Sequence, residues 1–568
     1  MIGATLTKPI LQPPTKKQPI VWCVGGIDSS GGAGVTRDAI TLADLNVHAC
    51  VLTTQLTVQS NAILLSKENM SASALNQQWQ VLFEDTPPNA IKIGAIANDE
   101  QALLLCARIQ TKLTPRPFVI WDPVLSTSSG GVLSDLSESV IDELLNTVDL
   151  VTPNTDELAW LADLPVTNEA SLLSAVNRLM GKGAKAVYVK GGHATWQDNA
   201  CDTFVCASHT IRFTQPKAQL GKLRGTGCIL ASAIAAFVVH NYGIEDALTL
   251  ANAYVSEIRY NAFSAPVASG VKSTVANTVK STVESALKST AQDTTQRETV
   301  TELYYSSNAL TYFARTNGFP TEPSRFPRVN FYRRSQVPSS DAFLSDEESG
   351  VASGSLGCIH SQGFPALTHT KLGVYPVVDS VDWIARLWPT GVRIMQLRVK
   401  EGSIDHKRQQ IKEAIALVKH TNCQLFINDY WELAIEMGAY GVHLGQEDID
   451  TANLDAIRSA GLRLGISTHG FAEIQRVRAL NPSYIALGHI FPTHTKDMLS
   501  KPQGVERLAK YVKLCEGIPT VAIGGINLSR INTVAKTGVN GVAVVSAITQ
   551  ADHPLKAYQA LAQEAGFA

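Results

Sequence analysis

The sequence predicts two α/β domains in one chain: a doubly wound, mostly parallel sheet, followed by a (β/α)8 barrel. Its 568 residues are too many for one hydrophobic core. Short apolar runs alternate with helical stretches in both halves, a pattern typical of parallel sheets covered by helices. We divide the chain into a leader (1–18), a first domain (19–275), a linker (276–365) and a second domain (366–568).

Apolar runs predict the strands of the first domain. Each run is followed by Gly, Asp, Pro or Asn and then by a helical stretch, as expected of strand–helix units. The runs lie at residues 21–24, 90–93, 119–121, 150–152 and 186–189.

The linker is marked by a repeated Lys-Ser-Thr that recurs every eight residues between 271 and 290. Apolar residues at 271, 275, 279, 283 and 287 fall on one helical face, which predicts an amphipathic spacer helix. Residues 339–355 are rich in Ser, Asp, Glu and Gly, which favours disorder. The aromatic-containing residues 300–338 are left as a segment that docks on one of the domains.

Eight strand candidates predict the second domain. Helical stretches such as 405–419 and 431–437 separate most of them, which indicates a (β/α)8 barrel with its chemistry at the carboxyl ends of the strands. The candidates are 373–379, 392–398, 423–429, 441–445, 462–468, 484–490, 520–525 and 541–547.

Composition excludes several classes of protein. The net charge of −2 gives no electrostatic basis for binding nucleic acid or an anionic membrane. The longest apolar run, Ile229–Val239, is too short to span a bilayer, and no apolar segment follows the N-terminal lysines as in a secretory signal. Nine cysteines without a CxxC pair predict reduced thiols and a cytoplasmic location.

The first candidate site is the sequence Gly225-Thr226-Gly227-Cys228, which precedes a long apolar helix. Glycines let a backbone approach phosphate closely, and the N–H groups at a helix start can hold an anion. The positive end of the helix dipole is expected to lower the pKa of the Cys228 thiol, which makes Cys228 a candidate base. Taken alone, the motif is equally typical of a Gly-rich turn with a buried cysteine.

Further motifs accompany it, each following a predicted strand. They are the segment 25–34 with Asp38 beyond it, Asp122-Pro123-Val124, Thr152-Pro153-Asn154-x-x-Glu157, and Lys190-Gly191-Gly192-His193. In this order they resemble the ribokinase-like superfamily, so the first domain is expected to have a ribokinase-like sheet. They resemble most closely the hydroxymethylpyrimidine/phosphomethylpyrimidine kinases, over about residues 20–275.

This resemblance implies two successive ATP-dependent phosphorylations of 4-amino-5-hydroxymethyl-2-methylpyrimidine. It also implies roles for individual residues. Asp38 and Gln59 would contact the pyrimidine, and Val124 would line its pocket. The remaining roles fall on the helix start and on two strand ends: Gly225, Gly227 and Cys228 would form the anion hole with Cys228 as base, and Thr226, Asn154, Glu157 and Lys190 would organise ATP and Mg²⁺.

The chain departs from the kinase pattern at two positions. Ala95 stands where the bacterial pattern often has Met, so we expect a different pocket wall there. Arg224 stands where a His is common, and we expect it to touch phosphate.

The second candidate site lies at the strand ends of the predicted barrel. Gln396, Arg398 and Lys400 alternate, so they point the same way and can hold an anion. Asp429 and Asp448 end adjacent strands, and such carboxylates suit Mg²⁺ that also binds a substrate phosphate. The bland interpretation is a set of surface ion pairs around a barrel rim.

The barrel motifs are similar to those of the thiamine-phosphate synthases, over about residues 370–560. These motifs are Tyr375-Pro376-x-x-Asp379, Gln396-x-Arg398-x-Lys400, Asn428-Asp429, His443-x-Gly445-Gln446-Glu447-Asp448, Gly465-x-Ser467-Thr468-His469, Gly524-Gly525 and Val545-Ser546. The resemblance implies that hydroxymethylpyrimidine diphosphate is joined to thiazole phosphate with release of diphosphate.

The resemblance also implies the site residues of the barrel. Asp429 and Asp448 would bind Mg²⁺, and Gln396 would face the pyrimidine. Residues at four strand ends would hold the diphosphate and pyrimidine, namely Arg398, Lys400, Asn428, Ser467 and Lys496, with Arg398 and Lys496 assigned to catalysis. The thiazole phosphate would contact Thr493, Thr495, Gly525, Val545 and Ser546.

Both resemblances together predict a bifunctional enzyme of thiamine biosynthesis that uses ATP and Mg²⁺ and binds small molecules. Three alternatives stay open: a pyridoxal-type kinase in the first half, a thiazole tautomerase-like barrel, and one half that is only a binding or regulatory module. Analogy with related kinases and synthases leaves a homo-oligomer open.

Overall fold

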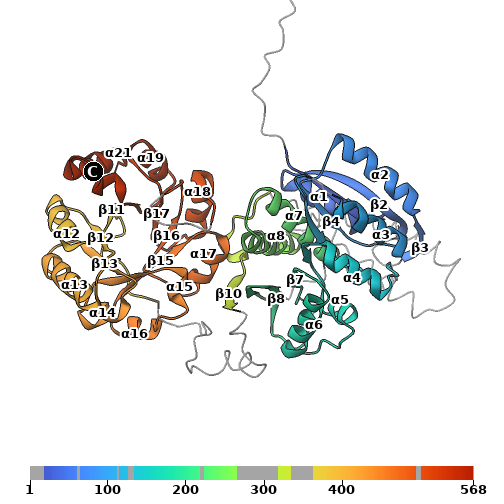
Figure 1. Ribbon diagram of the computed structural model, residues 1–568, viewed down its shortest axis with the longest axis horizontal. Coiled ribbons are helices and arrows are strands. Elements are labelled where there is room, and N and C mark those ends of the chain that lie inside the picture. Colours follow the sequence, from blue (N-terminus) through green and yellow to red (C-terminus); the bar gives the residue numbers. More distant parts are fainter. Residues whose placement is uncertain are drawn as a thin grey trace, which may run out of the picture. The chain divides into compact units, whose positions relative to one another are not determined.

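The structure is a computed structural model that describes residues 18–59, 64–111, 114–125, 133–192, 194–217, 223–264, 318–333, 363–493 and 500–566. The chain splits into two compact units, one containing most of the first half and one containing the barrel, and each is described by itself (Figure 1). In the part of the chain that the structure describes, no helix is long and apolar enough to cross a membrane.

The described part of the first half is built on a sheet with the strand order β10-β9-β8-β7-β6-β5-β4-β1-β2-β3. Strands β1, β2, β4, β5, β6 and β7 pair in parallel, whereas β3 and β10 are antiparallel to their neighbours. All five predicted strands are confirmed, and β7 is apolar along its whole length because helices cover both faces of the sheet, whereas β4 is apolar except for the buried Lys92. The strands are β1 (Ile20–Asp28), β2 (His48–Gln59), β3 (Leu64–Asn69), β4 (Ala90–Ile93), β5 (Phe118–Trp121), β6 (Leu150–Val151), β7 (Ala186–Val189), β8 (Asn199–Cys206), β9 (His209–Pro216) and β10 (Arg328–Arg333).

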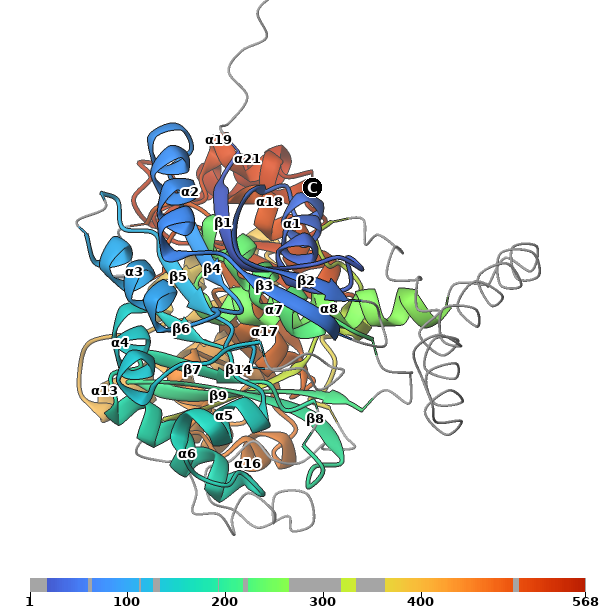
Figure 2. The same cartoon turned by 90° about the vertical axis from the view of Figure 1, so that its right-hand side faces the viewer.

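Helices cover this sheet in two groups, as expected of a doubly wound fold. Helices α1, α7 and α8 pack together in one group, and α2, α3 and α4 in another; Figure 2 shows the two groups on either side of the strands. The helices are α1 (Gly34–Asp44), α2 (Ala72–Asp85), α3 (Asp99–Gln110), α4 (Glu138–Thr147), α5 (Thr155–Ala162), α6 (Glu169–Gly181), α7 (Thr226–Val239) and α8 (Ile244–Ser264).

A β-bulge interrupts the pairing of β1 with β2. Gly25 lies opposite Thr53 and Gly26 lies opposite Gln55, so Thr54 is the extra residue. Such a bulge shifts the alternation of side chains between the two faces of a strand. Beyond it, Gln55, Thr57 and Gln59 are the buried residues of β2 and share one face.

Part of the predicted linker belongs to the sheet. Residues 328–333 form β10, which pairs antiparallel with β9, and Val329 is buried. The linker was expected to be partly helical or disordered, and this strand was not predicted, because its apolar residues are too few for a clear period in sequence. The repeat at 271–290, residues 339–355 and nearly all of the leader lie outside the described residues.

The second half forms a closed parallel barrel whose strands pair in chain order, with helices around them (Figure 1). All eight predicted strands are confirmed, each ending before the polar residues that follow it. They are β11 (Gly373–Val378), β12 (Ile394–Leu397), β13 (Gln424–Asn428), β14 (Gly441–Leu444), β15 (Arg463–Thr468), β16 (Tyr484–Gly488), β17 (Thr520–Ile523) and β18 (Gly541–Val544).

The helices of the second half follow the strands, with short ones at several strand ends. They are α12 (Val381–Leu387), α13 (Ile404–Val418), α14 (Trp431–Glu436), α15 (Gln446–Ile449), α16 (Leu454–Ser459), α17 (Phe471–Arg478), α18 (Gly504–Leu514), α19 (Leu528–Ala535), α20 (Ser546–Thr549) and α21 (Pro554–Glu564). Two 3-10 turns, Pro323–Arg325 and Trp388–Thr390, complete the described helical elements.

Candidate active sites

The two glycine-rich segments of the first half meet at the start of α7. Gly225 caps this helix with a φ of +76°, and a Cβ there would lie 2.2 Å from the carbonyl oxygen of Gly32. Gly34 has a φ of +62°, and a Cβ there would likewise lie 2.2 Å from the carbonyl oxygen of Gly26. Only glycine fits both positions, so the loop after β1 lies directly against the helix start that was predicted to hold phosphate.

Beneath this helix start lies a row of alternating charges, which we call the charge row: Asp38, Lys92, Asp122, Lys190 and Glu157. The nitrogen of Lys92 is 2.9 Å from Asp38 and 3.9 Å from Asp122, and the nitrogen of Lys190 is 2.7 Å from Asp122 and 3.4 Å from Glu157. Each lysine therefore lies between two carboxylates.

Burial and the neighbouring charges act against each other in the charge row. Burial disfavours the charged forms of Lys92 and Lys190, but the carboxylates beside them raise the pKa of both ammonium groups. Burial alone would raise the pKa of the Asp122 carboxyl group, but Lys190 and Lys92 hold this pKa below its usual range. For Asp38 and Glu157, burial outweighs the adjacent lysine and raises the pKa of the carboxyl group.

Three residues predicted to bind substrate or ATP already have protein partners. Asp38 accepts hydrogen bonds from Lys92 and, at 2.8 Å, from the hydroxyl of Ser232. Asn154 and Glu157 form a capping box at the start of α5, in which the amide oxygen of Asn154 accepts from the Glu157 N–H at 2.9 Å. Their ligand contacts therefore stay predictions, and any ligand would share them with these partners.

Cys228 lies in the first turn of α7, as expected, but its acidity differs from the prediction. The side chain is buried, and burial raises the pKa of the thiol to about 11, against the lowering effect of Lys92. The expectation of a lowered pKa is wrong because the loss of hydration outweighs the favourable electrostatics of the helix start. A role as base would require the thiol to lose its proton in the substrate complex.

The remaining predicted kinase residues surround the same loop. Gln59 ends β2, and its backbone N–H and carbonyl both bond to the hydroxyl of Ser29, at 2.9 and 2.8 Å. Arg224, expected to touch phosphate, lies 3.3 Å from a carboxylate oxygen of Asp28. Val124 follows β5, and its carbonyl accepts from Ser134.

In the barrel, pairing places the predicted residues on a continuous arc of strand ends. Strands β12, β13, β14 and β15 are consecutive neighbours and carry Gln396 and Arg398, Asn428 and Asp429, Asp448, and Ser467 at or just after their carboxyl ends. Lys400 and Asp429 are exposed, which leaves them accessible to a ligand. Lys496 and Thr495 lie outside the described residues.

Hydrogen bonds with backbone groups hold the two predicted metal ligands. Asp429 has a φ of +64°, and its N–H donates to the carbonyl of His443 at 3.0 Å. An aspartate in this left-handed region is uncommon and is often found at functional sites. One oxygen of Asp448 accepts from the N–H of Gly445 at 2.9 Å, which fixes the carboxylate beside the end of β14.

Six polar side chains form a continuous hydrogen-bonded chain through the barrel interior, which we call the polar chain. Its distances are 2.6 Å from Gln396 to Asn428, 3.3 Å from Tyr375 to Gln396, 2.9 Å between Tyr375 and Tyr484, 2.7 Å from Tyr484 to His443, and 2.8 Å from His443 to Ser467. The chain thus connects Asn428 to Ser467 through β13, β12, β11, β16, β14 and β15.

Three members of the polar chain were absent from the predicted site. Tyr375 and His443 stood inside the barrel motifs, which was a signal, but no role was assigned to them. Tyr484 opens β16 without any motif. The amino-acid sequence alone does not indicate that the side chains of Tyr375, His443 and Tyr484 meet inside the barrel.

The segments predicted to hold the thiazole phosphate also converge. A Cβ on Gly525, which has a φ of +64°, would lie 2.4 Å from the carbonyl oxygen of Pro492. The loop after β17 therefore lies against the segment that leads to Thr493. Val545 and Ser546 follow β18, the strand beside β17, so four of the five predicted residues fall on neighbouring strand ends.

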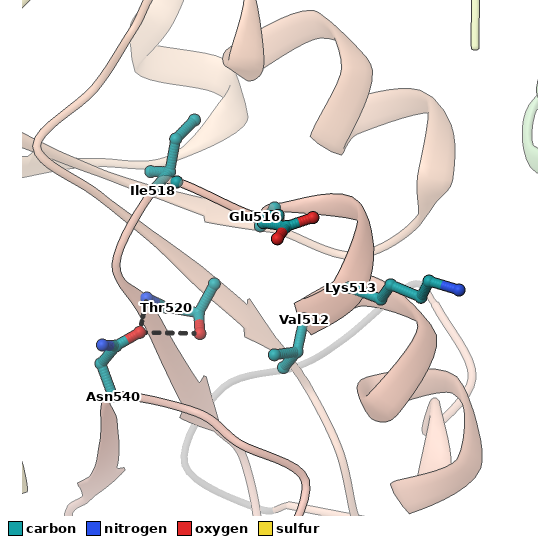
Figure 3. Close-up of a pocket in the computed structure, with 8 residues that line it drawn as sticks. Val512, Lys513, Glu516, Ile518, Thr520 and Asn540 are labelled. Carbon is teal, nitrogen blue, oxygen red and sulfur yellow. Dashed lines mark hydrogen bonds between the residues drawn. The ribbon is translucent and has the colours of Figure 1, made fainter. Parts of the chain in front are cut away.

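A separate pocket of about 420 Å³ lies at the other end of the barrel strands (Figure 3). Its wall includes Thr520, the first residue of β17, and Asn540, which precedes β18 and accepts from the Thr520 N–H at 2.8 Å. This pocket is therefore not part of the candidate site at the carboxyl ends.

Comparison with known proteins matches the two halves to two families. The model of the thiamine monophosphate synthase family matches residues 369–548, and the phosphomethylpyrimidine kinase model matches residues 28–272. Thiamine-phosphate synthase of Serratia proteamaculans (strain 568) is 60% identical over 188 residues, which are 33% of this chain and 88% of that relative.

Two solved structures are similar to the separate halves. Phosphomethylpyrimidine kinase from Clostridium difficile 630 is 27% identical and covers 42% of this chain and 99% of its own, with a TM-score of 0.37. Thiamine phosphate pyrophosphorylase from Pyrococcus furiosus is 29% identical and covers 35% of this chain and 97% of its own, with a TM-score of 0.32.

Proposed function

Because the chain belongs to the thiamine-phosphate synthase family and also carries a phosphomethylpyrimidine kinase domain, we propose that it performs consecutive steps of thiamine biosynthesis. The first half phosphorylates 4-amino-5-hydroxymethyl-2-methylpyrimidine and then its monophosphate, using ATP. The barrel then joins the resulting diphosphate to thiazole phosphate, giving thiamine phosphate and diphosphate. The co-occurrence of both domains in one chain is the observation that carries this proposal.

The glycine contacts at α7 support the kinase chemistry. The backbone N–H groups of Gly225, Gly227 and Cys228 hold the transferring phosphoryl group. The Cys228 thiolate takes the proton of the attacking hydroxyl as the new O–P bond forms and the bond from the γ-phosphorus to the departing ADP breaks. Lys190 lies within reach of Gly227, since a Cβ there would be 3.3 Å from its nitrogen. Catalysis of this kind depends on positioning and on neutralising charge.

Binding of ATP is assigned to the strand ends on the other side of the charge row. Asn154 and Glu157 begin α5, and Glu157 contacts Lys190. Their carboxylate and amide oxygens are the ligand types that Mg²⁺ accepts together with nucleotide phosphates. Asp38, Gln59 and Val124 are assigned to the pyrimidine side.

The donor set of the barrel fits Mg²⁺. Within the described residues no group of three or more His, Cys, Asp and Glu side chains is placed to hold a metal ion, but Mg²⁺ is usually held by only one or two carboxylates plus substrate phosphates. Asp429 and Asp448 at adjacent strand ends supply those carboxylates. Bound there, Mg²⁺ would supply positive charge that stabilises the diphosphate as a leaving group.

The other barrel residues orient the two substrates. Arg398 and Lys400 bind the diphosphate as cations, a role also assigned to Lys496. The polar chain holds Gln396, Asn428 and Ser467 in fixed orientations toward the pyrimidine. No covalent enzyme nucleophile is needed. The bond from the methylene carbon to the diphosphate breaks first, the aminopyrimidine supports the positive charge on that carbon, and the thiazole nitrogen then forms the new bond to it. The thiazole phosphate is assigned to Thr493, Thr495, Gly525, Val545 and Ser546.

The test supplies the purified chain with hydroxymethylpyrimidine, thiazole phosphate, ATP and Mg²⁺ and follows the products by mass spectrometry. Thiamine phosphate is the expected product. It should disappear in the Cys228→Ala variant, and at limiting Mg²⁺ it should form more slowly in the Asp429→Asn variant. Pyrimidine diphosphate without thiamine phosphate would leave only the kinase. Phosphorylation of pyridoxal in place of the pyrimidine, or a barrel that is inactive on supplied pyrimidine diphosphate, would favour the alternative kinase and barrel functions. A cytoplasmic location and a homo-oligomer stay predictions.

A further inference from the structure

Gln55 has a buried amide group that nothing in the described protein satisfies. Its side chain is fully buried, and neither its oxygen nor its nitrogen has a hydrogen-bond partner among the described residues. Gln101 shows the usual situation: it is equally buried, but its oxygen accepts from Ala97 and its nitrogen donates to the carbonyls of Thr54 and Met70. Buried amides are normally paired, so the exception at Gln55 requires an explanation.

The β-bulge in β2 determines where this amide lies. Gln55 is the first residue beyond the bulge, and it shares its face of β2 with Thr57 and with Gln59, which is assigned to the pyrimidine. It also lies against the glycine segment of β1, since a Cβ on Gly26 would be 3.0 Å from the Gln55 Cγ and 3.4 Å from its amide nitrogen. The unpaired amide is therefore beside the candidate kinase site.

The strand ends around Gln55 are built from very small residues. β1 carries Gly25 and Gly26, and its neighbour β4 is followed by Gly94 and Ala95. A Cβ on Gly25 would lie 3.6 Å from the Ala95 nitrogen, so the two small segments are adjacent. Ligands of open α/β sheets bind at the carboxyl ends of the strands. None of these four residues has a bulky side chain that would separate a ligand bound there from Gln55.

We propose that Gln55 is a further specificity-determining residue of the kinase site, whose amide hydrogen-bonds to the polar edge of the aminopyrimidine. The proposal rests on the proposed kinase function. A primary amide presents an acceptor beside a donor, which matches the amino group and adjacent ring nitrogen of an aminopyrimidine, as amide side chains pair with adenine. Pyridoxal has a pyridine ring without an amino group and cannot form both bonds.

The test replaces the amide with an apolar group of similar size in Gln55→Leu. In the full-length chain, kcat/KM for the aminopyrimidine should fall at least tenfold, mainly through KM, whereas kcat/KM for pyridoxal and KM for ATP should change less than twofold. The melting temperature without ligand should not fall, because the substitution removes an unpaired buried polar group.

Asn252→Leu is the matched control. Asn252 is a buried amide in α8 that donates to Tyr188 at 2.5 Å and to the Leu248 carbonyl at 3.0 Å. Its removal should lower the melting temperature and leave the preference for aminopyrimidine over pyridoxal unchanged. If Gln55→Leu behaves like this control, Gln55 is structural and the proposal is overturned.

Calorimetric binding of the aminopyrimidine without ATP separates this proposal from the proposed function. Weaker binding by Gln55→Leu than by the unmodified chain supports the role of Gln55 even if no phosphate is transferred, in which case only the kinase assignment fails. Equal binding by both proteins overturns the role of Gln55 even if the chain is an active kinase. Absence of binding to the unmodified chain overturns both.

Discussion

Replacing Lys92 by Met should strongly destabilise the first half of the protein. The Lys92 nitrogen is 2.9 and 3.1 Å from the two oxygens of Asp38 and 3.9 Å from Asp122, and all three side chains are 1% exposed. Met preserves most of the volume but leaves the Asp38 carboxylate buried with only Ser232 as a neutral partner. Breaking a buried ion pair by removing one partner costs about 3–5 kcal/mol, because the other charge loses its compensation.

Differential scanning calorimetry of the full-length chain measures this effect on the melting of the kinase domain. At about 2–4 °C per kcal/mol for a domain of this size, the transition should fall by about 6–20 °C. Lys182→Met is the matched control: Lys182 is 2.7 Å from Glu138 and 3.2 Å from Asp142, but at the surface, where water screens the pair. It should shift the transition far less.

A double variant tests the physical reason for the loss. Lys92→Met with Asp38→Leu removes both charges of the pair, and replacing a buried pair by apolar groups is often neutral or stabilising. It should therefore recover much of the stability lost in Lys92→Met. The reasoning would be refuted by Lys92→Met melting like Lys182→Met, or by a double variant less stable than Lys92→Met alone.

Three further predictions concern the proposed sites. If Cys228 is the base, kcat/KM of the kinase step should rise about tenfold per pH unit between pH 6 and 9, since burial raises the thiol pKa to about 11 and the thiolate is the active form; a flat profile would exclude that role. Asp429→Asn or Asp448→Asn should raise the Mg²⁺ concentration for half-maximal synthase activity at least tenfold and leave the kinase step, the internal control, unchanged. Tyr484→Phe should lower the free energy of unfolding of the barrel by about 1–3 kcal/mol in urea titrations, because His443 loses a buried partner; no change would mean that this link of the polar chain is not formed in solution.

The strand pattern was readable from sequence because burial dictates it locally. A strand covered on both faces is mostly apolar, as in Ala186–Val189 of β7, and polar residues become frequent where such a strand ends, as at Asn428 and Asp429. The order of such runs along the chain is enough to predict both the doubly wound sheet and the barrel.

The features that sequence analysis mispredicted or missed depend on contacts between residues that are far apart in the sequence. The acidity of Cys228 was mispredicted because the helix start is visible in sequence, whereas the depth of burial is not. The bulge that orients Gln55 arises from the register between β1 and β2, which no local pattern encodes. Tyr484 joins the polar chain only because the barrel closes and brings β16 opposite β11 and β14.

The hydrogen bonds of the polar chain all run in one donor-to-acceptor direction, because each hydroxyl group has only one proton to donate. The Gln396 amide donates to Asn428 and its oxygen accepts from Tyr375, so the single hydroxyl proton of Tyr375 is used. Tyr484 must then donate to Tyr375. With His443 in its neutral form, Tyr484 accepts from Nδ1 of the imidazole, whose Nε2 accepts from Ser467.

Every proton in this row thus points from Ser467 toward Asn428, and the two ends differ in character. The Ser467 hydroxyl donates its proton to His443, so it offers only lone pairs to a ligand. The side-chain oxygen of Asn428 accepts from Gln396, so this residue offers its N–H groups to a ligand. The barrel therefore presents an acceptor on β15 and a donor on β13. A ligand turned end over end would meet the wrong partner at both, which gives the site a built-in polarity for its substrate.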